Sequence, residues 1–347
     1  MALADFQRIY HFGDPAAEAK VCRSACALFD FSFLECVQVR GGGARKVVES
    51  FAGRSLLELP VGKIRYALRV DASGHALADL TIWRTAADTF EVMSGRREDI
   101  VELATYAADS IAVTELTDRA TLAVQGPAAL EALGRLLGRL GKIDAVAALP
   151  YFGFTDASLD GIACRIGRLG YTGEAGFEII CRKNAADGLW EALARYARPA
   201  GFIALDMLRI EAGFVLFSNE FRLPVTPAEA GLGRFYQAEP LRPPGIALVA
   251  FVADADCLDW PWQPGAPPVR PSQPGEIAVT SACDSIVARG ILGLGYVLAG
   301  QGADASLRDS TGIFRNIRQT SLPYYDTAKR RPRQAWRHVS GLGVGSL

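Results

Sequence analysis

The glutamate Glu178 follows a glycine-rich stretch, residues 167–176, which reads GRLGYTGEAG. Its four glycines predict a tight turn that leads into a β-strand, and they let another group approach the backbone without a Cβ in the way. In that strand Phe177 and Ile179 face one way and Glu178 faces the other. Glu178 is therefore a candidate polar anchor on the floor of a pocket, although a surface hairpin with a solvated glutamate fits the same turn chemistry.

A second carboxylate, Asp79, lies among apolar residues in the stretch ALADLTIW, residues 76–83. Residues 66–74 predict a strand that runs into a turn, and residues 76–83 predict the return strand. An aspartate in such a strand either points to solvent or is partly buried and held in position for a functional role. The residues alone leave both possibilities open.

Composition excludes several classes of function. The 347 residues are 50% hydrophobic and 22% charged, which predicts a large core and more than one domain. The net charge of -1, with both signs interspersed, indicates no nucleic-acid partner. No apolar run is as long as a membrane span and the first residues lack a signal-peptide pattern, so we expect a cytoplasmic protein without a membrane partner.

The cysteines and histidines point away from disulfide and metal chemistry. The seven cysteines are an odd number scattered along the chain, and the three histidines are too few for a histidine-ligated metal centre. We therefore expect no metal, and acid–base chemistry has to come mainly from carboxylates.

The remaining pattern predicts the elements that position these acids. Helices are expected at residues 14–28, 97–108, 128–140, 184–196 and 202–213, with strands between them. Asp14 can cap the first of these helices, and Gly213 ends the last one. Asp206 and Arg209, three residues apart, can pair on the surface of that last helix. The order strand, helix, strand, strand, helix fits α+β modules of the ferredoxin-like type. From about residue 240, frequent prolines separate short predicted strands, including 276–283 and 292–297, as in a small all-β module.

The sequence GYTGEAGFEI, residues 170–179, resembles the signature of the aminomethyltransferase family, which includes the T-protein of the glycine cleavage system. The resemblance implies that Glu178 holds the pterin ring of tetrahydrofolate. A carboxylate offers two acceptors to the adjacent N–H donors of a pterin edge. Asp79 matches the second aspartate of the family's Asp-Asp-Leu motif, which implies the catalytic role of orienting N5 of the folate and handling its proton.

Further segments extend the resemblance over roughly residues 20 to 330: LFDFS at 28–32, the strand that ends at Ser94, ALDMLRIEAG at 204–213, and LPYYD at 322–326. They imply that the folate contacts come from Phe31, Tyr66, Ser94, Tyr171 and Tyr325.

The chain also departs from the family pattern. Phe33 and Leu34 replace a His-Met pair, Ala78 replaces the first aspartate, and Ser94 replaces an asparagine. The largest departure is Leu205, which stands where the family has an arginine that contacts folate, and leucine cannot replace a charge-assisted hydrogen bond. Either another arginine compensates, with Arg84, Arg96 and Arg234 as candidates, or folate binding has changed.

The resemblance implies an α+β fold in the cloverleaf form of the T-protein. Two ferredoxin-like modules would surround a central folate cavity in residues 1–240, a small C-terminal β-barrel would occupy residues 241–328, and residues 329–347 would form a mobile tail.

The implied activity is a tetrahydrofolate-dependent one-carbon transfer, by a methyltransferase or demethylase that moves a methyl or methylene unit from a small-molecule donor to N5. Because of the departures, we expect a diverged member of the family. One alternative is the glycine-cleavage aminomethyltransferase, whose partner is a lipoylated carrier, the H-protein. Another is a non-catalytic folate-binding protein, whose related group has a cysteine and a glutamine where this chain has Gly170 and Glu174.

Overall fold

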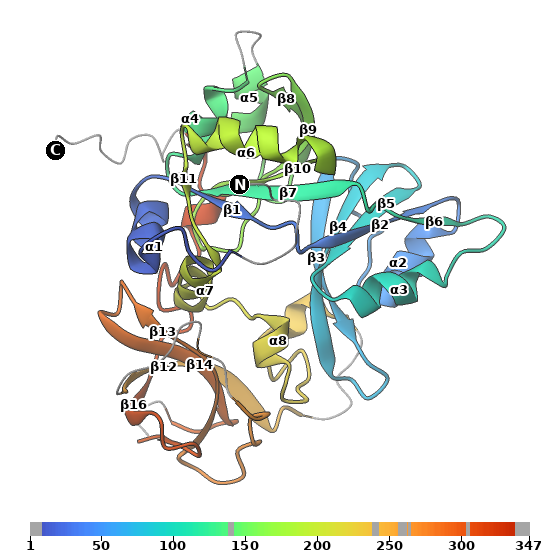
Figure 1. The fold of residues 1–347 in the computed structure, drawn as a ribbon. Helices are drawn as coiled ribbons and strands as arrows, with labels where there is room; N and C mark the ends of the chain where they lie inside the picture. The colour runs from blue at the N-terminus through green and yellow to red at the C-terminus, as the bar shows by residue number, and fades with distance from the viewer. Residues whose placement is uncertain are drawn as a thin grey trace.

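The structure is a computed structural model that describes residues 9–137, 142–237, 243–255, 262, 265–302 and 306–336. Within these residues the chain has a mixed α/β fold with three sheets, which surround the region where helix α7 (Phe202–Glu211) and helix α8 (Phe217–Glu220) lie (Figure 1). No helix in the described ranges is long and apolar enough to span a membrane.

The first sheet carries the strand with Asp79. Its order is β3 (Lys63–Val70), β4 (Ala76–Ala86), β5 (Thr89–Ser94), β2 (Glu35–Arg40) and β6 (Ala112–Glu115), with all pairs antiparallel. The helices α2 (Ala44–Ala52) and α3 (Arg97–Ala104) pack on one face, over a core that contains Phe51, Leu80 and Ile82. Because side chains alternate along β4, Asp79 and Trp83 belong to the opposite face.

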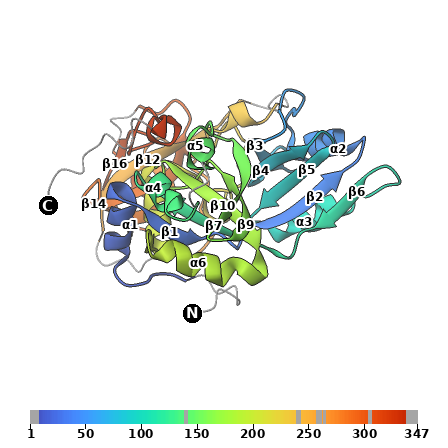
Figure 2. The ribbon, with the colours of Figure 1, turned by 90° about the horizontal axis from the view of Figure 1, so that it is seen from above.

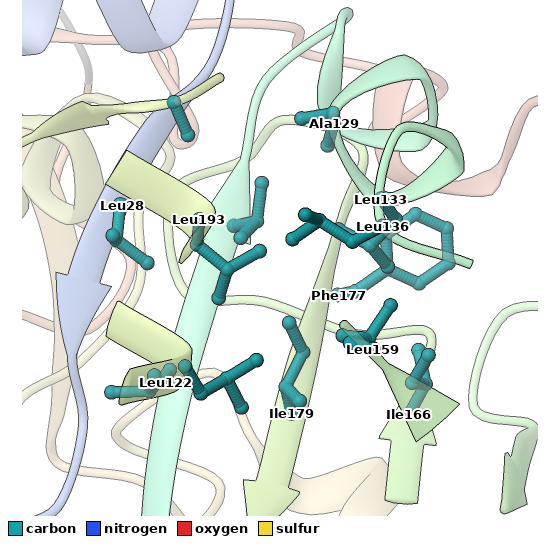
Figure 3. Packing of buried hydrophobic residues seen from close by; sticks show 14 of the residues in the cluster. Leu28, Leu122, Ala129, Leu133, Leu136, Leu159, Ile166, Phe177, Ile179 and Leu193 are labelled. Carbon is teal, nitrogen blue, oxygen red and sulfur yellow. The ribbon is translucent and has the colours of Figure 1, made fainter. Parts of the chain in front are cut away.

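The second sheet carries the strand with Glu178. Its order is β11 (Arg198–Pro199), β1 (Ala27–Asp30), β7 (Arg119–Gln125), β10 (Gly176–Arg182), β9 (Ile162–Gly167) and β8 (Phe154–Leu159). On one face lie the helices α4 (Ala129–Gly134), α5 (Lys142–Ala147) and α6 (Ala186–Ala194), the last preceded by the turn η1 (Lys183–Ala185) (Figure 2). Phe177 and Ile179 point into the core beneath these helices (Figure 3), which confirms the predicted facing of this strand.

The chain crosses between the two sheets directly after β1. Strand β1 pairs with β7 in the second sheet, whereas the next strand, β2, pairs with β5 and β6 in the first. The short link between them contains Phe31, Phe33 and Leu34. The link therefore lies where the two sheets meet.

Several predicted helices end earlier than expected, among them α3, which ends at Ala104 rather than residue 108. Asp14 caps α1 (Pro15–Ser24) as predicted, its side chain accepting a hydrogen bond from the Ala16 N–H at 2.9 Å. The helix ends at Ser24 rather than residue 28, because the following residues enter β1. Helix α4 likewise ends at Gly134 rather than residue 140.

Helix α7 ends before Gly213, whose φ of 67° provides the predicted left-handed stop. The expected pair of Asp206 and Arg209 forms at 2.8 Å. It is buried, however, and not on the surface as expected, because α7 is buried along most of its circumference. Arg209 also pairs with Glu220 of α8 at 2.9 Å and donates to Ser281 of the C-terminal region at 2.6 Å.

The C-terminal sheet confirms the two strands predicted after residue 240. Its order is β15 (Arg308–Asp309), β13 (Glu276–Ser285), β14 (Gly290–Leu298), β12 (Ile246–Asp254) and β16 (Arg315–Thr320). The short turn η2 (Gly233–Phe235) precedes it, and η3 (Arg331–Arg333) follows it.

Of the expected tail at residues 329–347, the structure describes residues 329–336, and 337–347 lie outside the described residues. Trp336 stacks on Phe177 with a centroid distance of 5.0 Å and an angle of 15°. Arg168 donates to the carbonyl oxygens of Pro332 and Gln334. The first part of this segment therefore packs against the second sheet.

Candidate functional site

A cavity of about 730 Å³ lies where the two N-terminal sheets, helix α7 and the segment after the C-terminal sheet meet. Its size falls in the range of small-molecule sites, roughly 300–1,000 Å³. Five of the predicted site residues line it: Phe31, Tyr66, Asp79, Tyr171 and Glu178. The structure therefore brings both candidate acids to one cavity from different sheets.

A glycine allows the two sheets to approach closely beside this cavity. A Cβ placed on Gly167 of β9 would lie 2.2 Å from the ring of Trp83, which belongs to β4. Arg165 of β9 also pairs with Glu91 of β5 at 2.7 Å. These contacts hold the Asp79 face of the first sheet against the Glu178 face of the second.

Asp79 is half-buried and lines the cavity. Burial raises the pKa of its carboxyl to about 6. Hydrogen bonds from its own backbone N–H and from the side chain of Tyr66 on the neighbouring strand β3 oppose this rise, and the charge of Asp99 adds to it. The carboxylate is thus mostly ionised at neutral pH, yet close enough to its pKa to exchange a proton.

Glu178 has small neighbours on both adjacent strands. It lies opposite Ala123 of β7 and Gly167 of β9, so neither side chain can cover it. The residue is 6% exposed, and the described residues provide no hydrogen bond or ion pair to its carboxylate. Burial therefore raises the pKa of Glu178 to about 8. A buried acid without a partner, facing a cavity, is suited to hold the N–H donors of a ligand.

The glycine-rich turn has the close approach that the sequence predicted. The side chain of Gln125 lies under it and donates to the carbonyl oxygens of Leu169 at 3.1 Å and Phe177 at 3.3 Å. A Cβ on Gly170 would lie 1.8 Å from Oε1 of Gln125, and one on Gly176 would lie 2.5 Å from Cδ. Only glycine at these positions leaves room for the buried amide that fixes the turn.

Two aromatic residues complete the walls near the acids. The hydroxyl of Tyr171 donates to the carbonyl oxygen of Val215, and its ring stacks on Phe214 with a centroid distance of 5.8 Å and an angle of 15°. Phe31 packs against Phe33 at 5.7 Å in the link between the sheets. The cavity thus has flat aromatic surfaces on which a ring could lie.

The other two predicted contacts lie elsewhere. Ser94 of the first sheet is buried next to helix α3, where its hydroxyl donates to Asp99 at 2.8 Å. Its neighbour Gly95 lines the cavity. The hydroxyl of Tyr325 donates to Glu174 at 2.5 Å, and the guanidinium of Arg23 lies 3.8 Å from its ring centroid. Neither side chain is among the residues that line the cavity.

Leu205 lines the cavity with an apolar side chain, and of the three arginines considered as replacements only Arg234 lines it as well. Arg84 instead donates to the carbonyl oxygens of Leu59 and Ala87, and Arg96 pairs with Asp99 at 2.6 Å.

Four cavity cations were not predicted from the sequence: Arg54, Arg65, Lys329 and Arg333. The run of basic residues at 329–333 is a signal in the sequence for Lys329 and Arg333. Arg54 and Arg65 carry no such signal, because only the fold brings them to the cavity.

Comparisons with known proteins identify the family of the chain. Residues 4–239 match the family described as GCVT N-terminal domain. An aminomethyltransferase from Geobacillus thermodenitrificans is 31% identical over 245 residues, which are 68% of this chain and 66% of that protein. A trimethylamine-oxide aldolase from Ruegeria pomeroyi is 32% identical over 231 residues, which are 63% of this chain and 29% of that protein. The chain thus matches just under two thirds of the first relative's length.

The glycine cleavage system aminomethyltransferase T from Bartonella henselae has a similar crystal structure. The TM-score is 0.75 at 24% identity, and the likeness covers 94% of both chains. This agreement confirms the expected T-protein-like fold.

Proposed function

Because the chain belongs to the aminomethyltransferase family, through its GCVT N-terminal domain, we propose that it transfers a one-carbon unit from a small donor to N5 of tetrahydrofolate. The observation that supports this most is the pair of cavity acids, Asp79 and Glu178, which two facing sheets supply to one hollow. We further propose two ferredoxin-like modules and a small C-terminal barrel as the framework of the site.

Each acid has a distinct task in this proposal. Glu178 accepts hydrogen bonds from the pterin edge, for which its carboxylate has free acceptors among the described residues. Phe31, Tyr66 and Tyr171 bound the ring. Tetrahydrofolate, when bound, supplies the nucleophilic N5. Asp79 accepts the proton that N5 loses as the new bond to carbon forms. The donor heteroatom leaves with the electron pair of its broken bond to carbon and takes up this proton from Asp79. Alignment of the two reactants supplies most of the rate enhancement.

The apolar part of the cavity favours a small methylated donor. Phe33, Leu34 and Leu205 line it, and each replaces a residue of the glycine-cleavage pattern with an apolar side chain. Such a wall suits the methyl groups of an amine. The relative named trimethylamine-oxide aldolase is consistent with a methylated nitrogen compound as donor.

A second candidate is the aminomethyltransferase reaction on a lipoylated H-protein. It is favoured by the name of the Geobacillus relative and by the fold shared with the Bartonella T-protein. The apolar substitutions at Phe33, Leu34 and Leu205 argue against it, because they change the cavity wall that would receive the aminomethyl group.

Binding provides the first test. Isothermal titration with tetrahydrofolate and with 5-methyltetrahydrofolate should show saturable binding of both to the wild-type chain, and Glu178→Ala should weaken both. Absence of affinity for either reduced folate would refute the proposal.

Product analysis provides the second test. Tetrahydrofolate is incubated with methylated amines in one series and with aminomethylated H-protein in another, and its one-carbon adducts are quantified. Transfer from a methylated amine would support the diverged activity, whereas robust methylene-tetrahydrofolate production from H-protein would assign the glycine-cleavage reaction. Tight folate binding without transfer from any donor would indicate the non-catalytic alternative.

A further inference from the structure

Residues 213–217, which we call the wall loop, lead from α7 to the start of α8 and form a continuous part of the cavity wall. All five of them line the cavity: Gly213, Phe214, Val215, Leu216 and Phe217. Phe214 is also the residue on which the ring of Tyr171 stacks. The course of the wall loop therefore determines where one aromatic surface of the cavity lies.

Two buried charged side chains hold the backbone of the wall loop. Nη1 of Arg209 donates to the carbonyl oxygen of Phe214 at 3.1 Å. The N–H of Leu216 donates to Oε2 of Glu220 at 2.6 Å. Arg209 and Glu220 also pair with each other at 2.9 Å, and both are fully buried. Neither is among the residues that line the cavity, so this ion pair holds the wall loop from the side away from the ligand.

The hydroxyl of Ser281 in β13 connects this ion pair to the C-terminal sheet. It accepts hydrogen bonds from Nη2 of Arg209 at 2.6 Å and from Nδ2 of Asn219 at 3.1 Å, and it donates to Oε1 of Glu220. A hydroxyl has one donor and two acceptor sites, so these three contacts use its full capacity. The neighbouring Thr280 donates to the same carboxylate oxygen at 2.9 Å. Both hydroxyl residues are fully buried.

The C-terminal sheet contributes little to the cavity lining directly. Within the described residues, its strands supply one lining residue, Leu248 of β12. Strand β13 supplies none, yet Ser281 joins it to the wall loop through an unbroken chain of hydrogen bonds and ion pairs. Buried charge-assisted hydrogen bonds are strong and demand a strict geometry. A network of this kind fixes the position of a loop more closely than apolar packing does.

We propose that Ser281 is a positioning residue of the folate cavity. Through the buried ion pair it fixes the wall loop, and it thereby places the stacked rings of Phe214 and Tyr171 that bound the ligand. This inference rests on the proposed function. It gives the C-terminal sheet a part in ligand binding that depends on buried polar contacts and not on the side chains that line the cavity.

The experiment compares Ser281→Ala with a matched control, Ser285→Ala, by calorimetric titration of the full chain with tetrahydrofolate. Ser285 lies on the same strand and is also buried, and its hydroxyl donates to a different carboxylate, that of Glu211, at 2.7 Å. Each variant loses a buried hydroxyl, so both should melt at a lower temperature than the wild type. Ser281→Ala should bind tetrahydrofolate roughly tenfold more weakly, a loss equivalent to one hydrogen bond to a charged group. Ser285→Ala should bind it like the wild type.

A double-mutant cycle separates positioning from a general loss of stability. Tyr171→Phe keeps the ring but removes the hydroxyl that donates to the carbonyl oxygen of Val215, so it releases the wall loop from the side of the cavity. Combined with Ser281→Ala, it should cost less affinity than the product of the two single losses, because both changes release the same loop. Combined with Ser285→Ala, the two losses should multiply to within about twofold.

Two results would overturn the inference and leave the proposed function standing. One is equal tetrahydrofolate affinity of Ser281→Ala and Ser285→Ala, and the other is independent effects of Ser281→Ala and Tyr171→Phe. Absence of binding by the wild type would overturn the inference together with the proposed function. If Ser281→Ala does not fold, Thr280→Val takes its place with the same expected outcomes, because it removes the other hydroxyl that donates to Glu220 and nearly keeps the side-chain shape.

Discussion

The side chain of Tyr66 hydrogen-bonds to the carboxylate of Asp79 across the adjacent strands β3 and β4. A donor to the charged form lowers a carboxyl pKa, whereas burial raises it. At Asp79 burial is the larger effect, and the pKa comes to about 6. Burial, opposed by the backbone N–H of Asp79 and by Tyr66, therefore sets the pKa of the acid at a value from which it can take up a proton near neutral pH.

Asp79→Asn should leave the protein folded and abolish most of its turnover. Asparagine has nearly the same shape and keeps an acceptor for Tyr66, but it cannot take the proton from N5. We expect one-carbon transfer to fall by about 100-fold or more, with the dissociation constant for tetrahydrofolate changed only a few-fold. Single-turnover transfer, calorimetry and thermal melting measure the three quantities. Unchanged turnover would remove Asp79 from its assigned role.

Tyr66→Phe should move the acidic limb of the pH–rate profile. The wild-type rate should fall as the pH drops through about 6, where Asp79 becomes protonated. Loss of the hydrogen bond raises the pKa of Asp79, so the midpoint should move up by roughly 1 unit. Well above the midpoint, the variant should recover to within a few-fold of the wild-type rate. A profile with an unmoved midpoint would separate Tyr66 from the titration of Asp79.

Folate binding should release a proton from Glu178. In the ligand-free protein burial holds its pKa at about 8, so the carboxyl is mostly protonated at pH 7. Two N–H donors from a pterin favour the ionised form and lower the pKa. Affinity should therefore rise with pH up to about 8 and then level off. Titrations at pH 7 in buffers of different ionisation enthalpy should report release of most of one proton.

The same group has the opposite effect on the stability of the ligand-free protein. Unfolded glutamate ionises near 4.5, but the folded protein keeps the proton until about 8. The folded state binds more protons in this window, so the free energy of unfolding should fall as the pH rises from about 4.5 to about 8. Glu178→Gln should remove this fall and release no proton on binding. Equal pH slopes for the two proteins would contradict the raised pKa.

The sequence was sufficient for the parts of the site that depend on local pattern. Strand alternation placed Glu178 on the face opposite Phe177, and the glycines at 170 and 176 leave room for another group, which proved to be Gln125. The resemblance brought Asp79 and Glu178 together before any fold was known, and the cavity contains both.

The sequence was insufficient where distant segments decide a residue's position. Nothing local distinguishes Arg234, which lines the cavity, from Arg84, which binds backbone carbonyl oxygens. Ser94 occupies a matched position, yet its hydroxyl is buried against Asp99, and the residue that follows the strand, Gly95, lines the cavity instead. The helical spacing predicted the ion pair of Asp206 and Arg209. It did not predict that the pair is buried, because burial depends on packing against the C-terminal sheet.

Arg209→Met should destabilise the protein strongly. The guanidinium is fully buried and pairs with Asp206 and Glu220, so the variant would take away the buried cation that balances both carboxylates. We expect the free energy of unfolding to fall by about 3–5 kcal/mol, as measured by urea denaturation. Arg195→Met removes an exposed arginine that lies 3.9 Å from Asp160 and should cost less than about 1 kcal/mol. Similar losses in the two variants would contradict the role of the buried network.

Gly167→Ala should push the two acid-bearing sheets apart. The new Cβ would lie 2.2 Å from the fully buried ring of Trp83, which has no room to yield. We expect a loss of about 1–3 kcal/mol in the free energy of unfolding together with weaker binding of tetrahydrofolate, because Asp79 lies on the same strand as Trp83. The matched control is Gly188→Ala in helix α6, where the Cβ would lie 3.7 Å from Ile162. That change should leave folate affinity unaltered and stabilise the helix by about 0.5–1 kcal/mol. If Gly167→Ala lowers stability but binds tetrahydrofolate like the wild type, the contact between Gly167 and Trp83 supports packing alone and does not set the distance between the acids.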